Sequence, residues 1–193
     1  MDFDGKLIAE KLKRWENYLR KYRLPKWDFI PDIGLYMEQL IPLMREYLNY
    51  LPPDLMGESL ITPAAVNNYV RKGIMPEPQK KRYYREHVAY LIIICTLKQS
   101  LPLSALERII PADLDLVTLS EIYDAFVEQH AAAADAFLQQ MSAYAPLDEN
   151  GAFRPATPAE TKSIILNAAL TGGFSKLLAE KLILLDDIKH PAD

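Results

Sequence analysis

Apolar side chains recur every three or four residues along most of the chain, which is the spacing of one face of an α-helix. Prolines and glycines separate these segments and predict where each helix ends. A proline-rich loop is expected at residues 51–57, and Gly172-Gly173 is expected to interrupt the helical pattern near the C-terminus. The predicted helices cover residues 4–22, 31–49, 62–74, 85–99, 103–110, 116–143, 157–171 and 174–188.

One short segment departs from the helical pattern. Pro76 and Pro78 interrupt the helical pattern at the start of residues 77–84 (EPQKKRYY). The segment ends in two tyrosines, a residue type that favours strands. This segment predicts a small β-hairpin. The expected fold class is therefore all-α with one small hairpin at its centre.

The helix expected at residues 62–74 has clear signals at both ends. Thr62 is a preferred N-cap, Pro63 suits the first helical position, and Gly73 suits a left-handed residue after the last turn. At 100° per residue, one side of this helix is apolar and the opposite side is polar. The polar side carries Asn67, Asn68 and Arg71.

The charge is distributed unevenly, although the whole chain carries only −4. Residues 62–98 hold seven basic and two acidic side chains (+5), residues 1–61 sum to −1, and residues 99–193 sum to −8. A basic segment in an acidic protein is typical of a nucleic-acid-binding surface. The alternative is a basic surface that serves only solubility.

Catalytic and metal-binding patterns are absent from the sequence. Three histidines lie far apart, and Cys95, the single cysteine, lies in the apolar run Leu91–Cys95, where a buried and inert thiol is expected. The chain has no Gly-rich phosphate loop and no Gly-x-Ser-x-Gly motif. We expect no enzymatic activity, no metal and no cofactor. No apolar run is long enough to span a bilayer and the N-terminus has no signal-peptide pattern, so a cytoplasmic protein without a membrane partner is expected.

The order of these segments resembles the winged helix-turn-helix of the mercury-resistance regulator (MerR) superfamily. The matching pattern consists of Val66, Tyr69 and the run Gly73–Pro76, then Arg82-Tyr83-Tyr84 and Glu86 before an apolar helix. The segments LYMEQ (35–39), VNNYV (66–70) and KRY (81–83) also look like an uncharacterised bacterial family, catalogued as a domain of unknown function and described as MerR-like.

This resemblance implies a transcriptional regulator that binds double-stranded DNA. Residues 1–26 would form an N-terminal helix, 27–112 the winged helix-turn-helix with its wing at 77–84, and 113–193 a helical region for dimerisation or effector binding. The expected base-reading residues are Asn67, Asn68 and Arg71, because Asn suits adenine and Arg suits guanine in the major groove. The expected contacts to the DNA backbone are Thr62, Lys72, Lys80, Lys81, Arg82, Tyr83 and Arg85.

The long helix at 116–143 is expected to join two copies of the chain. Its apolar residues follow the alternating four-and-three spacing of a coiled-coil seam, and the expected dimer contacts are Leu119, Tyr123, Phe126 and Phe137. A homodimer doubles the DNA contacts on a two-fold site. An unidentified small-molecule effector is a further partner that this resemblance allows. The alternative function is a helical module that binds a protein or a small ligand without binding DNA.

Overall fold

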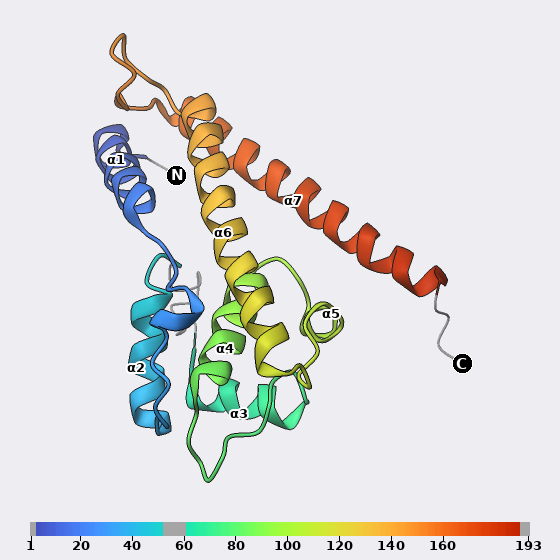
Figure 1. Cartoon of the computed structure of the whole chain (residues 1–193). Coiled ribbons are helices and arrows are strands. Elements are labelled where there is room, and N and C mark those ends of the chain that lie inside the picture. The colour runs from blue at the N-terminus through green and yellow to red at the C-terminus, as the bar shows by residue number, and fades with distance from the viewer. Residues whose placement is uncertain (1–2, 52–60, 190–193) are drawn as a thin grey trace. The chain divides into compact units, whose positions relative to one another are not determined.

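The structure is a computed structural model that describes residues 3–51 and 61–189 (Figure 1). Nearly all of the loop expected at residues 51–57 lies outside these residues. The chain divides into two compact units. Residues Leu24–His130 form one, here called the central unit, and residues Met1–Arg23 with Ala131–Asp193 form the other, here called the terminal unit. These units divide the chain at other places than the expected boundaries after residues 26 and 112.

Helices make up the regular structure of the described part of the chain, so the expected all-α class is confirmed. None of these helices is long and apolar enough to cross a membrane. The elements are α1 (Gly5–Lys21), the 3-10 helix η1 (Trp27–Phe29), α2 (Met37–Tyr47), α3 (Pro63–Arg71), α4 (Arg85–Leu97), α5 (Leu103–Ile109), α6 (Leu116–Tyr144) and α7 (Pro158–Lys189).

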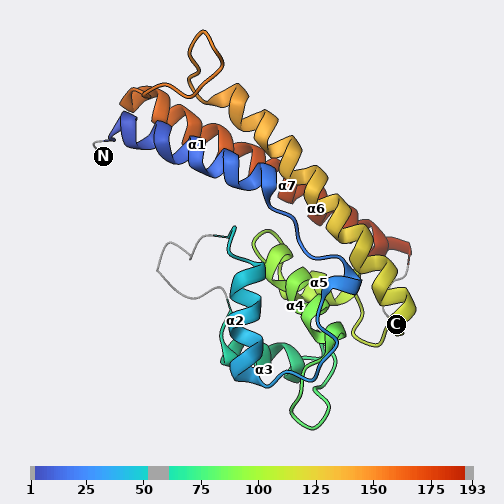
Figure 2. The same ribbon diagram turned by 60° about the vertical axis from the view of Figure 1, so that its left-hand side comes forward.

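The helix α4 forms the core of the central unit. Nine consecutive residues, His87–Cys95, are buried, which is why its sequence is apolar on every side and lacks a polar stripe. Helices α2 and α5 pack against it. The view in Figure 2 shows α2, α3 and α5 grouped around α4.

The first half of α6 also belongs to the central unit. The carboxylate of Asp124 accepts a hydrogen bond of 2.8 Å from the backbone N–H of Trp27, and the hydroxyl of Tyr123 donates one of 2.8 Å to the carbonyl of Pro25. Both bonds join α6 to the segment that leads into α2. Tyr123 is completely buried. This half of α6 is therefore part of the core.

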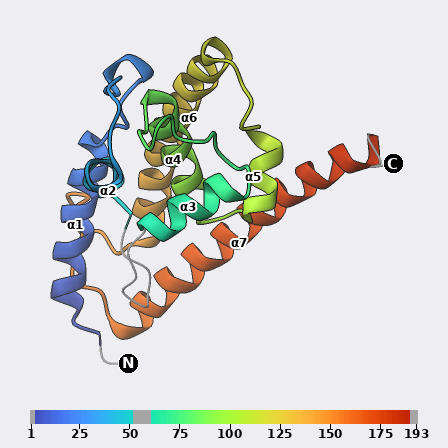
Figure 3. The same ribbon diagram turned by 90° about the horizontal axis from the view of Figure 1, so that it is seen from below.

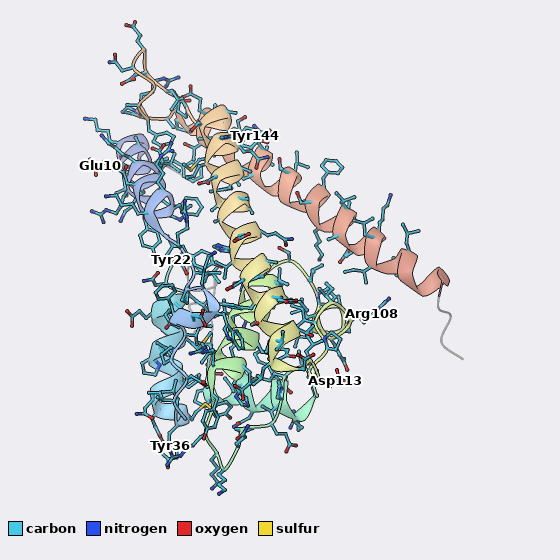
Figure 4. The ribbon with its side chains drawn as sticks, viewed as in Figure 1. Glu10, Tyr22, Tyr36, Arg108, Asp113 and Tyr144 are labelled. Carbon is cyan, nitrogen blue, oxygen red and sulfur yellow. The ribbon has the colours of Figure 1, made fainter. Side chains whose placement is uncertain are left out.

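The terminal unit consists of α1, the second half of α6 and α7. The rings of Trp15 on α1 and Phe137 on α6 meet edge to face, with centroids 5.1 Å apart. The hydroxyl of Tyr144, at the end of α6, lies 2.9 Å from that of Thr171 on α7. Figure 4 labels Tyr144 where the two helices meet. These contacts involve only the first half of α7.

The prediction of a β-hairpin wing at residues 77–84 is wrong. Gln79 and Arg82 exchange two backbone hydrogen bonds of 3.0 and 2.9 Å, and Tyr83 exchanges two of 2.8 Å with Leu35, but these are isolated bridges, and no strand is found among the described residues. Extending the first pair would join Glu77 to Tyr84, but the N–H of Tyr84 donates to the Nδ1 of His87, and the carbonyl of Glu77 lies 3.1 Å from the Nε2 of the same ring. The second pair, between Tyr83 and Leu35, joins this segment to the residues before α2 and not to the other half of a hairpin. The expected winged fold is thereby overturned.

The prediction of a helix break at Gly172-Gly173 is also wrong. The helix α7 continues through both glycines over 32 residues. A helical glycine costs about 1 kcal/mol relative to alanine, which weakens a helix without ending it when good helix formers flank it on both sides. The expected start of this helix is confirmed, because Thr157 and Glu160 exchange the two hydrogen bonds of a capping box, 2.8 and 3.2 Å long.

Candidate functional site

The helix α3 has the expected capping residues at both ends, although it spans Pro63–Arg71 and ends earlier than the expected range 62–74. The hydroxyl of Thr62 accepts a hydrogen bond of 3.1 Å from the backbone N–H of Ala65. At the other end Gly73 has a φ of 71°, and the N–H groups of Gly73 and Ile74 donate bonds of 2.9 and 3.0 Å to carbonyls of the last turn. These are the bonds of a Schellman motif, in which a left-handed glycine closes the helix. The short helix is therefore held by local interactions at both ends.

The two sides of α3 differ as the sequence indicates. Val66 and Tyr69 are buried, and the amine of Lys98, the C-cap residue of α4, donates a hydrogen bond of 3.2 Å to the hydroxyl of Tyr69. The opposite side faces solvent and exposes Asn67 and Arg71. The helix is thus attached by its apolar side and presents its polar side outward.

Asn68 and Arg71 form a pair on the outer side of α3. The guanidinium Nη2 of Arg71 donates a hydrogen bond of 2.8 Å to the amide oxygen of Asn68, one turn earlier. Asn68 is half-buried, whereas Arg71 is exposed. The bond uses one of the five N–H donors of the guanidinium, so the remaining donors stay available to an outside acceptor.

A two-lysine turn lies between α3 and α4. Lys80 has a φ of 50° and Lys81 a φ of 65°, and these are the described residues other than glycine with positive φ. The bonds between Gln79 and Arg82 close the turn around them. Two-residue turns of this kind normally use Asn or Gly, because a side chain at positive φ costs roughly 1 kcal/mol or more. Lysine is therefore an unfavourable choice for the fold at both positions.

Arg82 is positioned by the segment before α2. Its guanidinium lies over the ring of Tyr36, 5.0 Å from the centroid, and donates a hydrogen bond of 3.1 Å to the Tyr36 hydroxyl. Gly34 makes room for it, since a Cβ at Gly34 would lie 2.7 Å from the Cδ of Arg82. Arg82 stays exposed despite these contacts.

These features lie at one end of the central unit. Figures 1 and 2 place α3 and the loop that contains the two-lysine turn at the lower end of the unit, and Figure 4 labels Tyr36 at the same end. Seen from below in Figure 3, α3 lies on the viewer's side of α4. We call the five exposed cations of this end the basic surface: Arg71, Lys72, Lys80, Lys81 and Arg82.

Three residues expected to contact the DNA backbone have other places in the structure. Tyr83 is only 4% exposed. The hydroxyl of Thr62 caps α3. The guanidinium of Arg85 donates a hydrogen bond of 3.0 Å to the carbonyl of Ile30 and lies 3.5 Å from a carboxylate oxygen of Asp28. All three support the fold of the central unit and do not extend the basic surface.

Cys95 and His87, two side chains of the central unit that could carry chemistry, are buried. Burial raises the pKa of the Cys95 thiol to about 11, and the residue is completely buried. The ring of His87 is 1% exposed, with its Nδ1 bonded to the N–H of Tyr84 and its Nε2 3.1 Å from the carbonyl of Glu77. No group of metal-binding side chains occurs in the described part of the chain.

The residues expected to form a dimer lie mostly inside one chain. Leu119 and Tyr123 are 1% and 0% exposed and belong to the core of the central unit. Phe126 is half-buried, and Phe137 packs against Trp15 of the terminal unit. Leu119 and Tyr123 therefore have no exposed surface to offer a second copy.

Tyr36 and the exposed leucines of α7 were not among the expected site residues. Tyr36 contacts Arg82 across 46 positions of sequence, and no local pattern indicates such a pair. For α7 a signal was present: leucines recur at positions 170, 177 and 184, seven residues apart. Their exposure is 60, 52 and 60%.

Comparison with known families gives one match. The sequence pattern of the family described as "Domain of unknown function (DUF1836)" matches residues 25–126, which is more than half of the chain and nearly the whole central unit. No curated protein and no solved structure matches the chain. The expected similarity to an uncharacterised family is confirmed, whereas nothing in these comparisons supports the expected winged MerR-like domain.

Proposed function

Since the chain belongs to the DUF1836 family, whose description names no activity, we propose a function from its own surface: the central unit binds double-stranded DNA with sequence preference. The outer side of α3 enters the major groove, and the two-lysine turn contacts the phosphate backbone. The proposal uses a helix and a turn, without a β-stranded wing.

The observation that carries this proposal is the two-lysine turn beside α3. Lys80 and Lys81 occupy backbone positions that suit asparagine and glycine better, and both side chains are exposed. Unfavourable backbone conformations of this kind are found at functional sites, where they hold a side chain in a required position. Two adjacent ammonium groups at the tip of a closed turn suit two neighbouring phosphates.

The outer side of α3 supplies groups that read bases. The amide of Asn67 can exchange two hydrogen bonds with N6 and N7 of adenine, and the guanidinium of Arg71 can donate two to O6 and N7 of guanine. Asn68 holds Arg71 through the 2.8 Å bond between them. In this arrangement Asn68 positions Arg71 and does not itself contact a base. Lys72 and Arg82 contact phosphates on either side of the groove.

The charge of the segment supports the same partner. Residues 62–98 carry +5 in a chain of −4, so the rest of the protein is acidic. Five of the seven cations of this segment form the basic surface, while Arg85 and Lys98 bond within the fold. An acidic body repels DNA, so the protein approaches DNA with its basic surface foremost.

A protein partner without DNA is the second candidate. Phe29, the last residue of η1, is 78% exposed, and Ile33, in the segment between η1 and α2, is 62% exposed. Exposed large apolar side chains that lie close together often mark protein interfaces. Binding to DNA decides between the two candidates.

The test begins with selection of bound sites from random double-stranded DNA, followed by titration of the preferred site at several salt concentrations. We expect the logarithm of the affinity to fall linearly with the logarithm of the salt concentration. Lys81→Ala should make this slope shallower by about one unit and weaken binding to every sequence. Arg71→Ala should weaken the preferred site by about 1–3 kcal/mol and flatten the base preference.

Arg45→Ala is the matched control, because it removes the same charge from the last turn of α2, roughly 13 Å along the helix from Tyr36. It should bind DNA as the parent does. If the parent shows no salt-dependent binding, or the Arg71 and Lys81 variants bind as well as the control, DNA is not the partner and the protein-binding alternative takes its place.

A further inference from the structure

The helix α7 exposes far more apolar surface than a solvated helix does. Nine large apolar residues between Ile165 and Leu185 are exposed, by 51–71%. Figure 1 shows the second half of α7 running away from the end of α6. Between residues 163 and 179 the helix has a single charged side chain, Lys176.

The most regular part of this surface is a leucine stripe on the outer side of α7: Leu166, Leu170, Leu177 and Leu184, each 52–62% exposed. At 100° per residue these four lie within about 40° of one another around the helix. Ala168, which lines a cavity against α1 and α6, lies about 180° away from them. The stripe therefore points away from the contacts that α7 makes within its own unit, and its seven-residue repeat is that of a helix paired with another helix.

The two glycines of α7 are a second, independent observation. A Cβ added at Gly172 or Gly173 would meet no atom within 4 Å, so no contact with the residues that the structure describes requires glycine at either position. Glycine weakens a helix, so its presence without an internal reason indicates an external one. Gly173 lies about 40° from the leucine stripe, where a missing side chain lets the backbone of another helix come close.

The apolar surface around the stripe approaches the size of a dimer interface. Six of the nine residues lie within about 80° of the middle of the stripe (Leu166, Leu170, Phe174, Leu177, Leu184 and Leu185), and at about 100 Å² each they expose on the order of 600 Å². The largest apolar patch of a typical monomer is about 300–600 Å², and a stable interface buries roughly 800 Å² on each partner.

The charges of α7 favour another copy over a lipid surface. The helix carries four basic residues (Lys162, Lys176, Lys181, Lys189) and four acidic ones (Glu160, Glu180, Asp186, Asp187). Helices that lie on membranes have a cationic face, which α7 lacks. A balanced, apolar helix with a heptad stripe is complementary to itself in a two-fold interface. We propose that two copies of this chain pair through the leucine stripes of their α7 helices.

Sedimentation equilibrium of the full chain without DNA tests this pairing. The parent should be a dimer at about 10 µM, and the double variant Leu170→Gln with Leu177→Gln should raise the dissociation constant by roughly 100-fold or more. The matched control is Leu116→Gln with Val117→Gln, two residues 59% and 68% exposed at the start of α6. The control should dimerise as the parent does. A monomeric parent at about 100 µM, or a double variant that dimerises like the control, overturns the proposal.

Cysteine cross-linking tests the same contact in a chain that keeps most of its apolar surface. Buried Cys95 does not react, so a single introduced cysteine reports its own surroundings. If the helices pair in parallel, Leu177→Cys cross-links to itself under mild oxidation. If they pair in opposite directions, Leu166→Cys and Leu184→Cys cross-link when mixed.

Val117→Cys is the control and should stay uncrosslinked. If neither Leu177→Cys alone nor the mixture of Leu166→Cys and Leu184→Cys forms cross-links, the proposal is overturned. A monomeric parent that sediments with phospholipid vesicles also overturns it, because the leucine stripe would then bind a lipid surface. All of these measurements are made without DNA, so a failure of the pairing and a failure of DNA binding are observed separately.

Discussion

The guanidinium of Arg71 and the amide oxygen of Asn68 are joined by a 2.8 Å hydrogen bond across one turn of α3. Asn68 is half-buried, so it has fewer conformations than the exposed arginine that it holds. A long side chain that is held before binding loses less entropy when it meets its target. The bond therefore restricts the Arg71 side chain on the polar side of α3 before a partner binds.

Arg71→Lys separates base reading from simple attraction to phosphate. Lysine keeps the charge but cannot form the planar, two-point contact that arginine makes with guanine. We expect affinity for the preferred site to fall by about 1–3 kcal/mol, with affinity for random DNA and the salt slope unchanged. Anisotropy titrations on both DNAs measure this. Equal losses on both DNAs would assign Arg71 to the phosphate backbone.

Replacing the two-lysine turn by Asn-Gly should improve stability and weaken DNA binding. Lys80→Asn with Lys81→Gly places residues that tolerate positive φ at both positions, so the free energy of unfolding should rise by about 1–2 kcal/mol. Affinity for all DNA should fall, and the salt slope should become shallower by about two units. Denaturant unfolding and salt titration measure the two effects. A variant that is less stable than the parent would show that the lysines serve the fold.

Cys95 should make the protein less stable as the pH rises from 9 to 10. Burial raises the pKa of this thiol from 9.0 to about 11, so in this range the unfolded chain releases the proton and the folded chain keeps it. The unfolded state then binds fewer protons, and the free energy of unfolding falls by at most about 1 kcal/mol per pH unit.

The comparison with a Cys95 variant is needed because tyrosines in the unfolded chain, with an ordinary pKa of 10.0, begin to titrate in the same range, and burial raises the pKa of Tyr90 to about 12. Unfolding curves at pH 8, 9 and 10 for the parent and for Cys95→Ala measure the slope, with pH values chosen from these pKa values. The variant should be less stable at every pH because of the cavity, but its slope should be flatter. Parallel slopes would contradict the assignment.

Gly5→Ala should destabilise the terminal unit. A Cβ at Gly5 would collide with the backbone oxygen of Ala156, a buried residue in the loop before α7, and the backbone cannot move aside as a flexible side chain can. We expect a loss of about 1–3 kcal/mol in a denaturant titration. Gly172→Ala is the matched control: its Cβ would meet no described atom within 4 Å, so it should add about 0.5–1 kcal/mol to the free energy of unfolding by helix propensity. A Gly5→Ala protein as stable as the parent would show that α1 does not pack closely on this loop.

The local sequence predicts the helices well because their signals act over a few residues. The cap at Thr62, the left-handed Gly73 and the capping box of Thr157 with Glu160 each form bonds within four positions, and the structure contains all of them. The burial of α4 follows in the same way from its continuous apolar run. The exposed side of α3 could therefore be assigned from the sequence.

The errors concern interactions between distant parts of the chain. The segment at 77–84 has the tyrosines of a hairpin, but Tyr83 pairs with Leu35, 48 positions away, and no pattern near Tyr83 indicates that partner. The seam of Leu119 and Tyr123 has the spacing of a dimer contact, and the fold of the central unit buries it within one chain. Periodicity gives the apolar side of a helix and leaves its partner undefined.

The sequence by itself determined the helical class, the ends of most helices and the basic segment, because caps, propensity and charge are properties of neighbouring residues. Tertiary structure alone decided which cations stay exposed. Arg85 turns inward to the carbonyl of Ile30, whereas Arg82 is held at the surface by Tyr36. Tertiary structure also decided which leucines are left uncovered, since burial depends on the whole fold, and in this chain the leucine stripe of α7 remains in contact with water.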